Sequence, residues 1–260
     1  MPDLSPADRA KRAAALRALD WVEEGMRVGL GTGSTAEWVL RLLAERIDGD
    51  GLRITGVPTS SGTERRARAL GIPLVDLDSA GRLDVTIDGA DEVGPDLALI
   101  KGGGAALLQE KIVAAASDRM VVIGDAGKSV ERLGAFPLPV EIVRFGARTT
   151  MARIAEALED EDVLGRDAAL RPGQDGPLVT DEGHHIVDLS LRRIGDPRRL
   201  AMRLSQVPGV VEHGLFVDMA DVAILGLPDG GVEIRDAATG AVRTEPAPDG
   251  GEGLFDDLPG

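Results

Sequence analysis

The chain of 260 residues contains no cysteine and no tyrosine, and it has only four phenylalanines and two tryptophans. The absence of cysteine excludes disulfides, thiolate nucleophiles and zinc sites with thiolate ligands, and it fits a reducing compartment. No run of about 18 apolar residues occurs, so we expect no membrane-spanning helix. The first residues, MPDLSPADRAKR, lack the apolar segment of a signal peptide. We therefore expect a cytoplasmic protein.

Positive charge is also scarce. The chain has 29 Lys and Arg residues against 44 Asp and Glu residues, which gives a net charge of −15 at pH 7. Such a charge repels nucleic acid and anionic membranes, and few aromatic side chains are present on which bases could stack. We expect neither nucleic acid nor membrane as a partner. Two of the four lysines, Lys101 and Lys128, lie in glycine-rich loops of the kind that bind ligands.

Two carboxylates follow a predicted buried strand over 84–88. The alternating β-branched run in this segment stops at Asp88, and Asp91 lies three residues later. The next strand-like run, 97–100, ends at a lysine and three glycines. Ligands of an open α/β sheet bind outside the carboxyl ends of its strands. We therefore expect one cleft to contain Asp88, Gly89, Ala90, Asp91, Lys101, Gly102, Gly103 and Gly104.

Glu110 is the candidate proton acceptor in this cleft. The pattern predicts a helix over 105–116, and Glu110 lies about two turns inside it among apolar neighbours, where no cap requires a carboxylate. Partial desolvation would raise the pKa of Glu110 toward neutrality, the range that suits a general base. The alternative is that Glu110 pairs with Lys111 or a nearby arginine on a solvated face. The spacing alone does not decide between the two.

A second glycine-rich turn joins a predicted strand, 26–30, to a helix over 35–46. Its backbone amides and hydroxyls face the N-terminus of the helix, an arrangement that favours phosphate. The predicted contacts are Thr32, Gly33, Ser34 and Thr35. The turn also matches the G-x-G-x-x-A pattern of dinucleotide-binding folds. Such a fold needs an acidic residue after the second strand, where this chain has Pro58-Thr59-Ser60-Ser61, whose hydroxyls suit a second edge of a polyol or phosphate site.

The order of elements predicts an α/β fold. Residues 1–136 are expected to form a Rossmann-like, mostly parallel sheet with helices on both faces, including a strand over 72–77. Residues 218–236 are expected to complete this large catalytic domain with a returning strand at 223–227. Lys128 follows the predicted strand 120–124 and is a candidate ligand, although a surface turn would equally accept it.

The second half of the chain has a different pattern of predicted helices and strands. Residues 137–217 predict a smaller α+β domain with the ferredoxin-like order β-α-β-β-α-β. Its middle strands are expected to be a hairpin of 178–180 and 186–191, with one further short strand near Ala169. From 237 to 260 the chain is rich in Gly, Pro, Asp and Glu without periodicity. We expect a disordered acidic tail there.

Metal binding is not favoured by the sequence. Of the three histidines, His184 and His185 fall at the predicted hairpin turn, where we expect surface residues, and no pair including His213 has the spacing of two ligands on one helix. The carboxylates Asp88, Asp91 and Glu92 could hold Mg²⁺ together with a phosphate. Nearby lysines make that additional positive charge less necessary, so we expect no metal and no cofactor.

Several ordered motifs resemble type A ribose-5-phosphate isomerases. They are GLGTGSTA at 29–36, DGADE at 88–92, IKGGGAAL at 100–107, FPLPVE at 136–141 and PGVVEHGLF at 208–216. The similarity extends from about residue 10 to residue 230. It implies a metal-free aldose–ketose isomerase of the non-oxidative pentose phosphate pathway, cytoplasmic, without a cofactor, and a homodimer or homotetramer. The residues beyond about 236 lie outside the family pattern.

The resemblance also implies roles for single residues. Glu110 matches the proton acceptor of the family, and the substrate contacts match 32–35, 88–91, 101–104 and Lys128. Interconversion of ribose 5-phosphate and ribulose 5-phosphate moves a proton between C2 and C1 through an enediolate. Lys101 would stabilise its charge, while Asp88 and Asp91 would bind hydroxyls and assist ring opening.

Other classes remain open. A phosphosugar-binding regulator could use the same phosphate site, although no helix-turn-helix segment precedes it and the net charge is wrong for DNA. A related sugar-phosphate deaminase or a CoA-transferase-like enzyme could share the sheet. No histidine is placed for the ring opening that a deaminase requires, and a CoA transferase would need a glutamate nucleophile.

Overall fold

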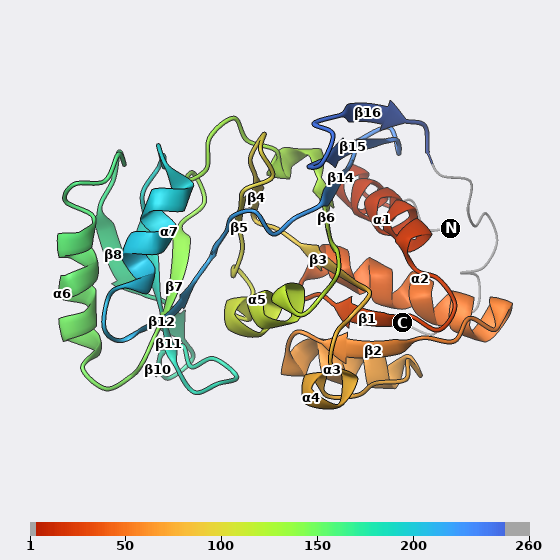
Figure 1. Cartoon of the computed structure of the whole chain (residues 1–260), viewed down its shortest axis with the longest axis horizontal. Helices are drawn as coiled ribbons and strands as arrows, with labels where there is room; N and C mark the ends of the chain where they lie inside the picture. Colours follow the sequence, from red (N-terminus) through yellow and green to blue (C-terminus); the bar gives the residue numbers. More distant parts are fainter. Residues whose placement is uncertain (1–3, 248–260) are drawn as a thin grey trace.

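A seven-stranded sheet forms the larger half of the molecule (Figure 1). The computed structural model describes residues 4–247. The strand order is β16-β15-β14-β6-β3-β1-β2, in which the five strands from β14 to β2 are parallel and the last two in the sequence are antiparallel. The strands are β1 Arg27–Leu30, β2 Thr55–Pro58, β3 Val85–Gly89, β6 Met120–Asp125, β14 Val222–Gly226, β15 Val232–Asp236 and β16 Val242–Glu245. The predicted α/β class with a mostly parallel sheet is confirmed.

Helices cover both faces of this sheet because its central strands are apolar on both sides. Along β6, Val121 and Ile123 join the core under α1 and α2, whereas Val122 joins the core on the opposite face. On that opposite face α4 and α5 pack against β2. The helical segments are α1 Pro6–Ala18, η1 Leu19–Trp21, α2 Ser34–Asp50, α3 Ser61–Ala69, α4 Leu77–Ala80, α5 Leu107–Ala115 and η2 Ala126–Lys128.

The first helix begins as its sequence predicts. The side chain of Ser5 accepts a hydrogen bond from the backbone amide of Asp8, and Pro6 occupies the first helical position. The alanine-rich face of α1 then lies close to β14, where a Cβ atom on Gly226 would fall 1.8 Å from the carbonyl oxygen of Ala10. Only glycine fits there. This close packing brings the first helix beside the central sheet.

A four-stranded antiparallel sheet forms the smaller half, with order β12-β7-β11-β8 and helices α6 and α7. Its elements are β7 Leu138–Ile142, α6 Ala147–Ala157, β8 Asp167–Leu170, β11 His185–Ser190, α7 Pro197–Ser205 and β12 Val210–His213. The β-α-β-β-α-β order appears as predicted, but the hairpin with 178–180 is wrong. The second strand is β8, which confirms the further short strand expected near Ala169. It is an edge strand whose sequence Asp-Ala-Ala-Leu carries little strand signal, so 178–180 was assigned to the hairpin instead. Residues 180–184 form a turn instead, and β9 Pro172–Gly173 pairs with β10 Gly176–Pro177.

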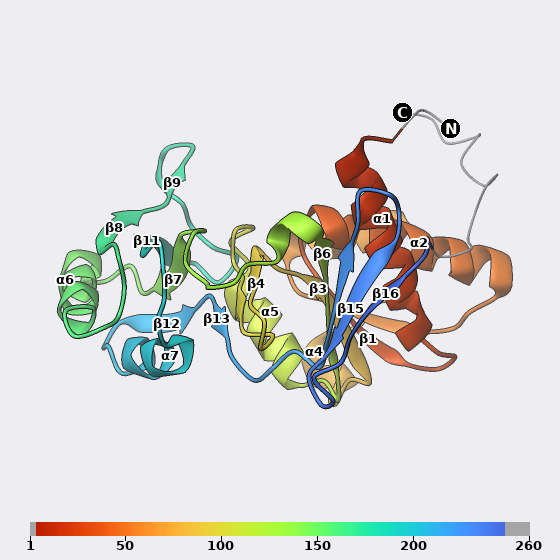
Figure 2. The same ribbon diagram turned by 90° about the horizontal axis from the view of Figure 1, so that it is seen from above.

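A third sheet lies between the two halves (Figure 2). It contains β4 Glu92–Val93, β5 Leu99–Ile100 and β13 Leu215–Phe216, all antiparallel. The run at 97–100 was expected to be a strand of the large sheet, and this expectation is corrected by the structure. The short apolar run is buried against β6 and β14 from outside the sheet. Burial on both sides makes such a run look like a central strand.

Two further expectations fail. The predicted strand 72–77 makes only an isolated bridge between Leu74 and Gly56, because Pro73 donates no ladder hydrogen bond and Asp76 caps α4 through the amide of Ser79. The predicted disordered tail contains β16, which pairs with β15 and places Glu245 beside Arg17. The side chains of β16 are largely exposed, so no apolar alternation marks it. Residues 248–260 of that prediction lie outside the described residues.

The proposed limits of the two domains stay a prediction. Separate apolar cores do lie under the large sheet and under the small one. Within residues 4–247, no helix is both long and apolar enough to cross a bilayer.

Candidate active site

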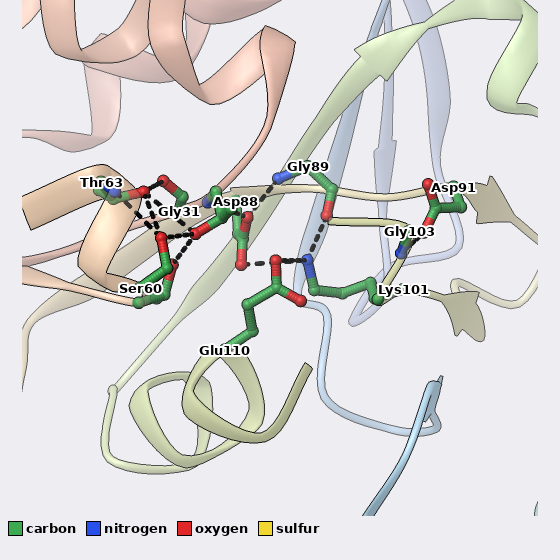
Figure 3. Close-up of polar contacts among 12 residues, drawn as sticks. Gly31, Ser60, Thr63, Asp88, Gly89, Asp91, Lys101, Gly103 and Glu110 are labelled. Atoms are coloured by element: carbon green, nitrogen blue, oxygen red, sulfur yellow. Dashed lines mark hydrogen bonds and ion pairs between the residues drawn. The ribbon is translucent and has the colours of Figure 1, made fainter. Parts of the chain in front are cut away.

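A buried lysine joins two buried carboxylates at the carboxyl end of β3 (Figure 3). Lys101 Nζ lies 3.0 Å from Asp88 Oδ2 and 3.4 Å from Glu110 Oε1, and it donates a hydrogen bond of 2.5 Å to the carbonyl of Gly89. The three side chains are 2%, 0% and 5% exposed. Charges that are this deeply buried carry a large desolvation cost unless they are paired. The cluster is therefore a candidate site for chemistry.

Backbone amides hold Asp88 in place. Its Oδ1 atom accepts hydrogen bonds from the amides of Thr32 at 3.0 Å and Gly89 at 2.7 Å. A Cβ atom on Gly31 would lie 2.3 Å from this oxygen, so the turn after β1 requires glycine to approach the carboxylate. These contacts join the ends of the neighbouring parallel strands β1 and β3.

Burial and nearby carboxylates give Glu110 an unusual pKa. Burial is the largest cause that raises the pKa of Glu110, and the charge of Asp88 raises it further, whereas Lys101 lowers it. The net effect is a pKa of about 8. Burial also raises the pKa of Asp88 against the effect of Lys101 and the two amides. Within the described chain, Glu110 Oε2 is buried without a hydrogen-bond partner. Because two amides stabilise ionised Asp88, the proton shared by this cluster at neutral pH belongs on Glu110.

Lys101 remains charged in this setting. Burial alone would lower its pKa, but the charges of Asp88 and Glu110 outweigh burial and raise the pKa. The alternative partner of Glu110, Lys111, points elsewhere. Its ammonium binds Glu212 Oε1 at 2.7 Å and the carbonyls of His213 and Leu215 at 2.6 and 2.9 Å. The structure thus supports the desolvated carboxylate over the solvated pair.

The three glycines form a loop beside the cluster, in which Gly102 is buried and Gly103 and Gly104 are exposed. Gly103 donates its amide to Asp91 Oδ2 at 2.8 Å, and a Cβ atom on Gly103 would lie 2.6 Å from Asp91 Oδ1. Gly102 has a φ of +105°, which favours glycine. Gly104 lies against Thr32, since its added Cβ would be 3.5 Å from Thr32 Cγ2. The loop 102–104 and the turn 31–35 therefore lie against each other beside the buried cluster.

The turn 31–35 leaves the N-terminus of α2 open. Gly33 is the N-cap with a φ of +108°, and no side chain caps the first turn. The amides of the first turn lack helical partners and favour an anion. Ser34 Oγ accepts a hydrogen bond of 3.0 Å from Lys11, while Thr35 is buried at the start of the helix. The sequence suggested no role for Lys11 because it could not place α1 beside this turn.

Hydroxyls line the other side of the turn. Thr32 Oγ1 lies 2.8 Å from Thr59 Oγ1, 2.9 Å from Ser60 Oγ and 3.0 Å from Thr63 Oγ1. Thr63 also donates to the carbonyl of Gly31 at 2.9 Å. The expected second edge after β2 is thus present through Thr59 and Ser60. Thr63, in the first full turn of α3, was missed.

Lys128 lies at the edge of the site without contacting the cluster. It ends η2, directly after β6, which is the parallel neighbour of β3. Its stem folds over Gly124, and its ammonium has no hydrogen-bond or ion-pair partner among residues 4–247. This position leaves Lys128 available to a ligand.

Carboxylates and histidines do not gather into a metal site in the described part of the chain, where no group of three or more is suitably placed. Glu92 turns away from Asp91 and accepts the amides of Gly134 at 2.7 Å and Phe136 at 2.5 Å. The two adjacent histidines, expected to be surface residues, are both partly exposed. His184 is only 25% exposed and lies 2.9 Å from the buried Glu141, because the turn at 180–184 folds onto β7.

The family follows from comparison with known proteins. The family model of Ribose 5-phosphate isomerase A (phosphoriboisomerase A) matches residues 55–230. The chain belongs to this family. Ribose-5-phosphate isomerase A of Roseobacter denitrificans is 60% identical over 243 residues, which cover 94% of this chain and 93% of that relative. The relative from Ruegeria sp. is 59% identical, with the same coverage.

Solved structures agree with the family assignment. Ribose 5-phosphate isomerase from Plasmodium falciparum superposes with a TM-score of 0.83 at 36% identity, over 88% of this chain and 98% of that chain. A D-ribose-5-phosphate isomerase in complex with phospho-erythronic acid gives a TM-score of 0.82 at 38% identity, over 88% and 99%. The resemblance inferred from the motifs is therefore confirmed, and the chain is an isomerase of this family.

Proposed function

We propose that this protein interconverts D-ribose 5-phosphate and D-ribulose 5-phosphate through a cis-enediolate, with Glu110 as the base. The observation that carries the mechanism is the buried Glu110, whose Oε2 atom has no partner within residues 4–247 and whose other oxygen lies 3.4 Å from Lys101. An unpaired buried carboxylate is costly in a structural role. Such a carboxylate is suited to accept a proton from the substrate.

The phosphate would bind at the open N-terminus of α2. Free amides of the first helical turn, the hydroxyls of Ser34 and Thr35, and the ammonium of Lys11 would hold its charge. Lys128, without a partner in the described chain, would contribute from the neighbouring strand end. With the phosphate there, the sugar would extend across Thr32 toward the loop 102–104, because Gly104 lies against Thr32.

The reaction needs one proton moved between adjacent carbons. Asp88 and Asp91 would bind ring hydroxyls and assist opening of the furanose. Glu110 would remove the proton from C2, and the C2–H electrons would form the enediolate as charge moves to O1. Lys101 and the loop amides would stabilise that oxygen. The proton of the O2 hydroxyl would then pass to O1, and Glu110 would return the carbon-bound proton to C1, which leaves the ketone at C2. No electron acceptor is required, because substrate and product are isomers.

The wider setting is proposed from the family resemblance alone. We infer a cytoplasmic enzyme of the non-oxidative pentose phosphate pathway that works as a homodimer or homotetramer. No contact in the described residues favours the alternative regulator, deaminase or CoA-transferase-like activities.

Incubation of the purified protein with ribose 5-phosphate tests the function directly. Appearance of ketopentose phosphate, followed by its ultraviolet absorbance, is the expected result, and exhaustive chelation should leave the rate unchanged. Absence of turnover would refute the function. Loss of turnover on chelation, restored by Mg²⁺, would refute the metal-free mechanism while leaving the function in place.

A further inference from the structure

An arginine from the small sheet reaches into the glycine loop of the active site. Arg171, which follows β8, donates from Nη1 to the carbonyl of Gly102 at 2.8 Å and to that of Gly103 at 3.1 Å. Its Nε and Nη2 atoms bind the carboxylate of Asp188 on β11 at 2.9 and 2.6 Å. The side chain is 13% exposed. The guanidinium is thus fixed by a bidentate ion pair on one side and grips two carbonyls on the other.

The direction of those two carbonyls determines the direction of two amides. No peptide bond in residues 4–247 is cis, and in a trans peptide the C=O and N–H groups point in opposite directions. The carbonyl of Gly102 shares its peptide with the amide of Gly103, which donates to Asp91 at 2.8 Å. The carbonyl of Gly103 shares its peptide with the amide of Gly104, which has no protein partner among the described residues.

We propose that Arg171 is a positioning residue for the isomerisation. By holding both carbonyls on the side of the small sheet, it directs the amide of Gly103 to Asp91 and presents the amide of Gly104 to the substrate. This inference rests on the proposed function, because the amide of Gly104 gains its role from an oxygen that becomes charged in the enediolate.

The flexibility of glycine explains why the loop needs the hydrogen bonds from Arg171. Gly103 and Gly104 are exposed, and glycine peptides rotate more freely than any others. A donor that stabilises a transition state is effective when it is already oriented before the reaction. The positive charge of Arg171 also polarises both peptides and makes their amides better donors. Arginine suits this role because its planar fork serves Asp188 and the carbonyls together, which one ammonium cannot do.

Three variants separate positioning from general stability. Arg171→Met removes the hydrogen bonds to the two carbonyls and to Asp188, whereas Arg171→Lys keeps only the positive charge. Arg166→Met is the matched control, because Arg166 also binds backbone carbonyls, those of Leu158, Glu159 and Glu161, beyond the far end of α6. For each variant, kcat and KM for ribose 5-phosphate are measured, and amide hydrogen exchange is followed in a peptide covering 101–106.

Arg171→Met should lower kcat about 10- to 100-fold, with KM within about threefold, because phosphate binding is unaffected while a preoriented donor is lost. Exchange in 101–106 should accelerate in this variant and not in Arg166→Met. Arg171→Lys should recover kcat only in part. Parental kcat in Arg171→Met, full recovery by lysine, or unchanged exchange would each overturn the proposal. A parent protein that does not isomerise the sugar would refute the proposed function instead, and the exchange result alone would then decide whether Arg171 orders the loop.

Discussion

The pH dependence of catalysis should report the ionisation of Glu110. A general base accepts a proton only in its ionised form, and burial with Asp88 raises the pKa of Glu110 to about 8. We therefore expect kcat/KM, which reflects the free enzyme, to rise about tenfold per pH unit below pH 7 and to level above pH 9. The phosphate group of the substrate loses its second proton near pH 6, about two pH units below the pKa of Glu110. The two ionisations should therefore be distinguishable in the pH profile.

The raised pKa of Glu110 should also make the stability of the protein depend on pH. The folded protein keeps a proton on Glu110 between pH 4.5 and about 8 that the unfolded chain releases, so this residue lowers the free energy of unfolding as pH rises through that window. A shift of this size corresponds to about 5 kcal/mol at pH 9. Glu110→Gln removes the ionisation. The variant should match the parent near pH 4 and become progressively more stable than it toward pH 9.

Initial rates from pH 5 to 9.5 and urea unfolding from pH 4 to 9.5 test both statements on the same proteins. Glu110→Gln should lose about 10²–10⁴-fold in kcat and lose the pH step in any residual rate. In Asp88→Asn the step should move to lower pH, because the charge of Asp88 helps to raise the pKa of Glu110. The control Glu161→Gln changes a buried carboxylate that pairs with Arg199 far from the site. It should keep the step. A Glu110→Gln variant that turns over within about threefold of the parent would refute the role of this residue.

Three further variants test other parts of the molecule. Thr35→Ala should raise KM for ribose 5-phosphate about tenfold and leave weak activity on unphosphorylated ribose unchanged, because a bond to a charged phosphate is lost; equal loss on both substrates would place the turn elsewhere. Truncation after residue 237 removes β16 and should lower Tm by about 2–6 °C relative to truncation after residue 247, and equal Tm values would show that β16 contributes nothing. Lys111→Met should lower the free energy of unfolding by about 1–3 kcal/mol, because Glu212 and two carbonyls lose the ammonium that binds them, and an unchanged urea midpoint would contradict this.

Local signals predicted most of the elements that carry the site. A strand, a glycine-rich turn and a helix follow one another within about 25 residues at 26–50, so periodicity and capping suffice to find them. The same holds for β3, whose end carries Asp88. Glu110 was chosen as a candidate because a carboxylate within an apolar helical face is unusual, and the structure places it beside Lys101. These features depend on neighbours in the sequence.

Features that depend on distant segments were missed or placed wrongly. Lys101 reaches Asp88 from the end of β5, which belongs to the three-stranded sheet, so the two residues were grouped correctly although the strand was assigned to the wrong sheet. Lys11 arrives 23 residues before Ser34, and Arg171 contacts Gly102 from 69 residues away. Neither side chain has a local pattern that marks it, because its role arises only when separate elements pack together.

The placement of these distant cations resolves an apparent conflict between the charge of the protein and that of its substrate. A chain with a net charge of −15 should repel a sugar phosphate over long distances. Within the described residues, however, neither Lys11 nor Lys128 has a carboxylate partner, and both lie at the carboxyl end of the sheet with the open N-terminus of α2. Interactions between exposed charges fade within about 10 Å at 0.1 M ionic strength, so these nearby groups outweigh the distant acidic surface. We therefore expect the affinity for phosphate to depend on the cations that lack carboxylate partners at this edge rather than on the total charge.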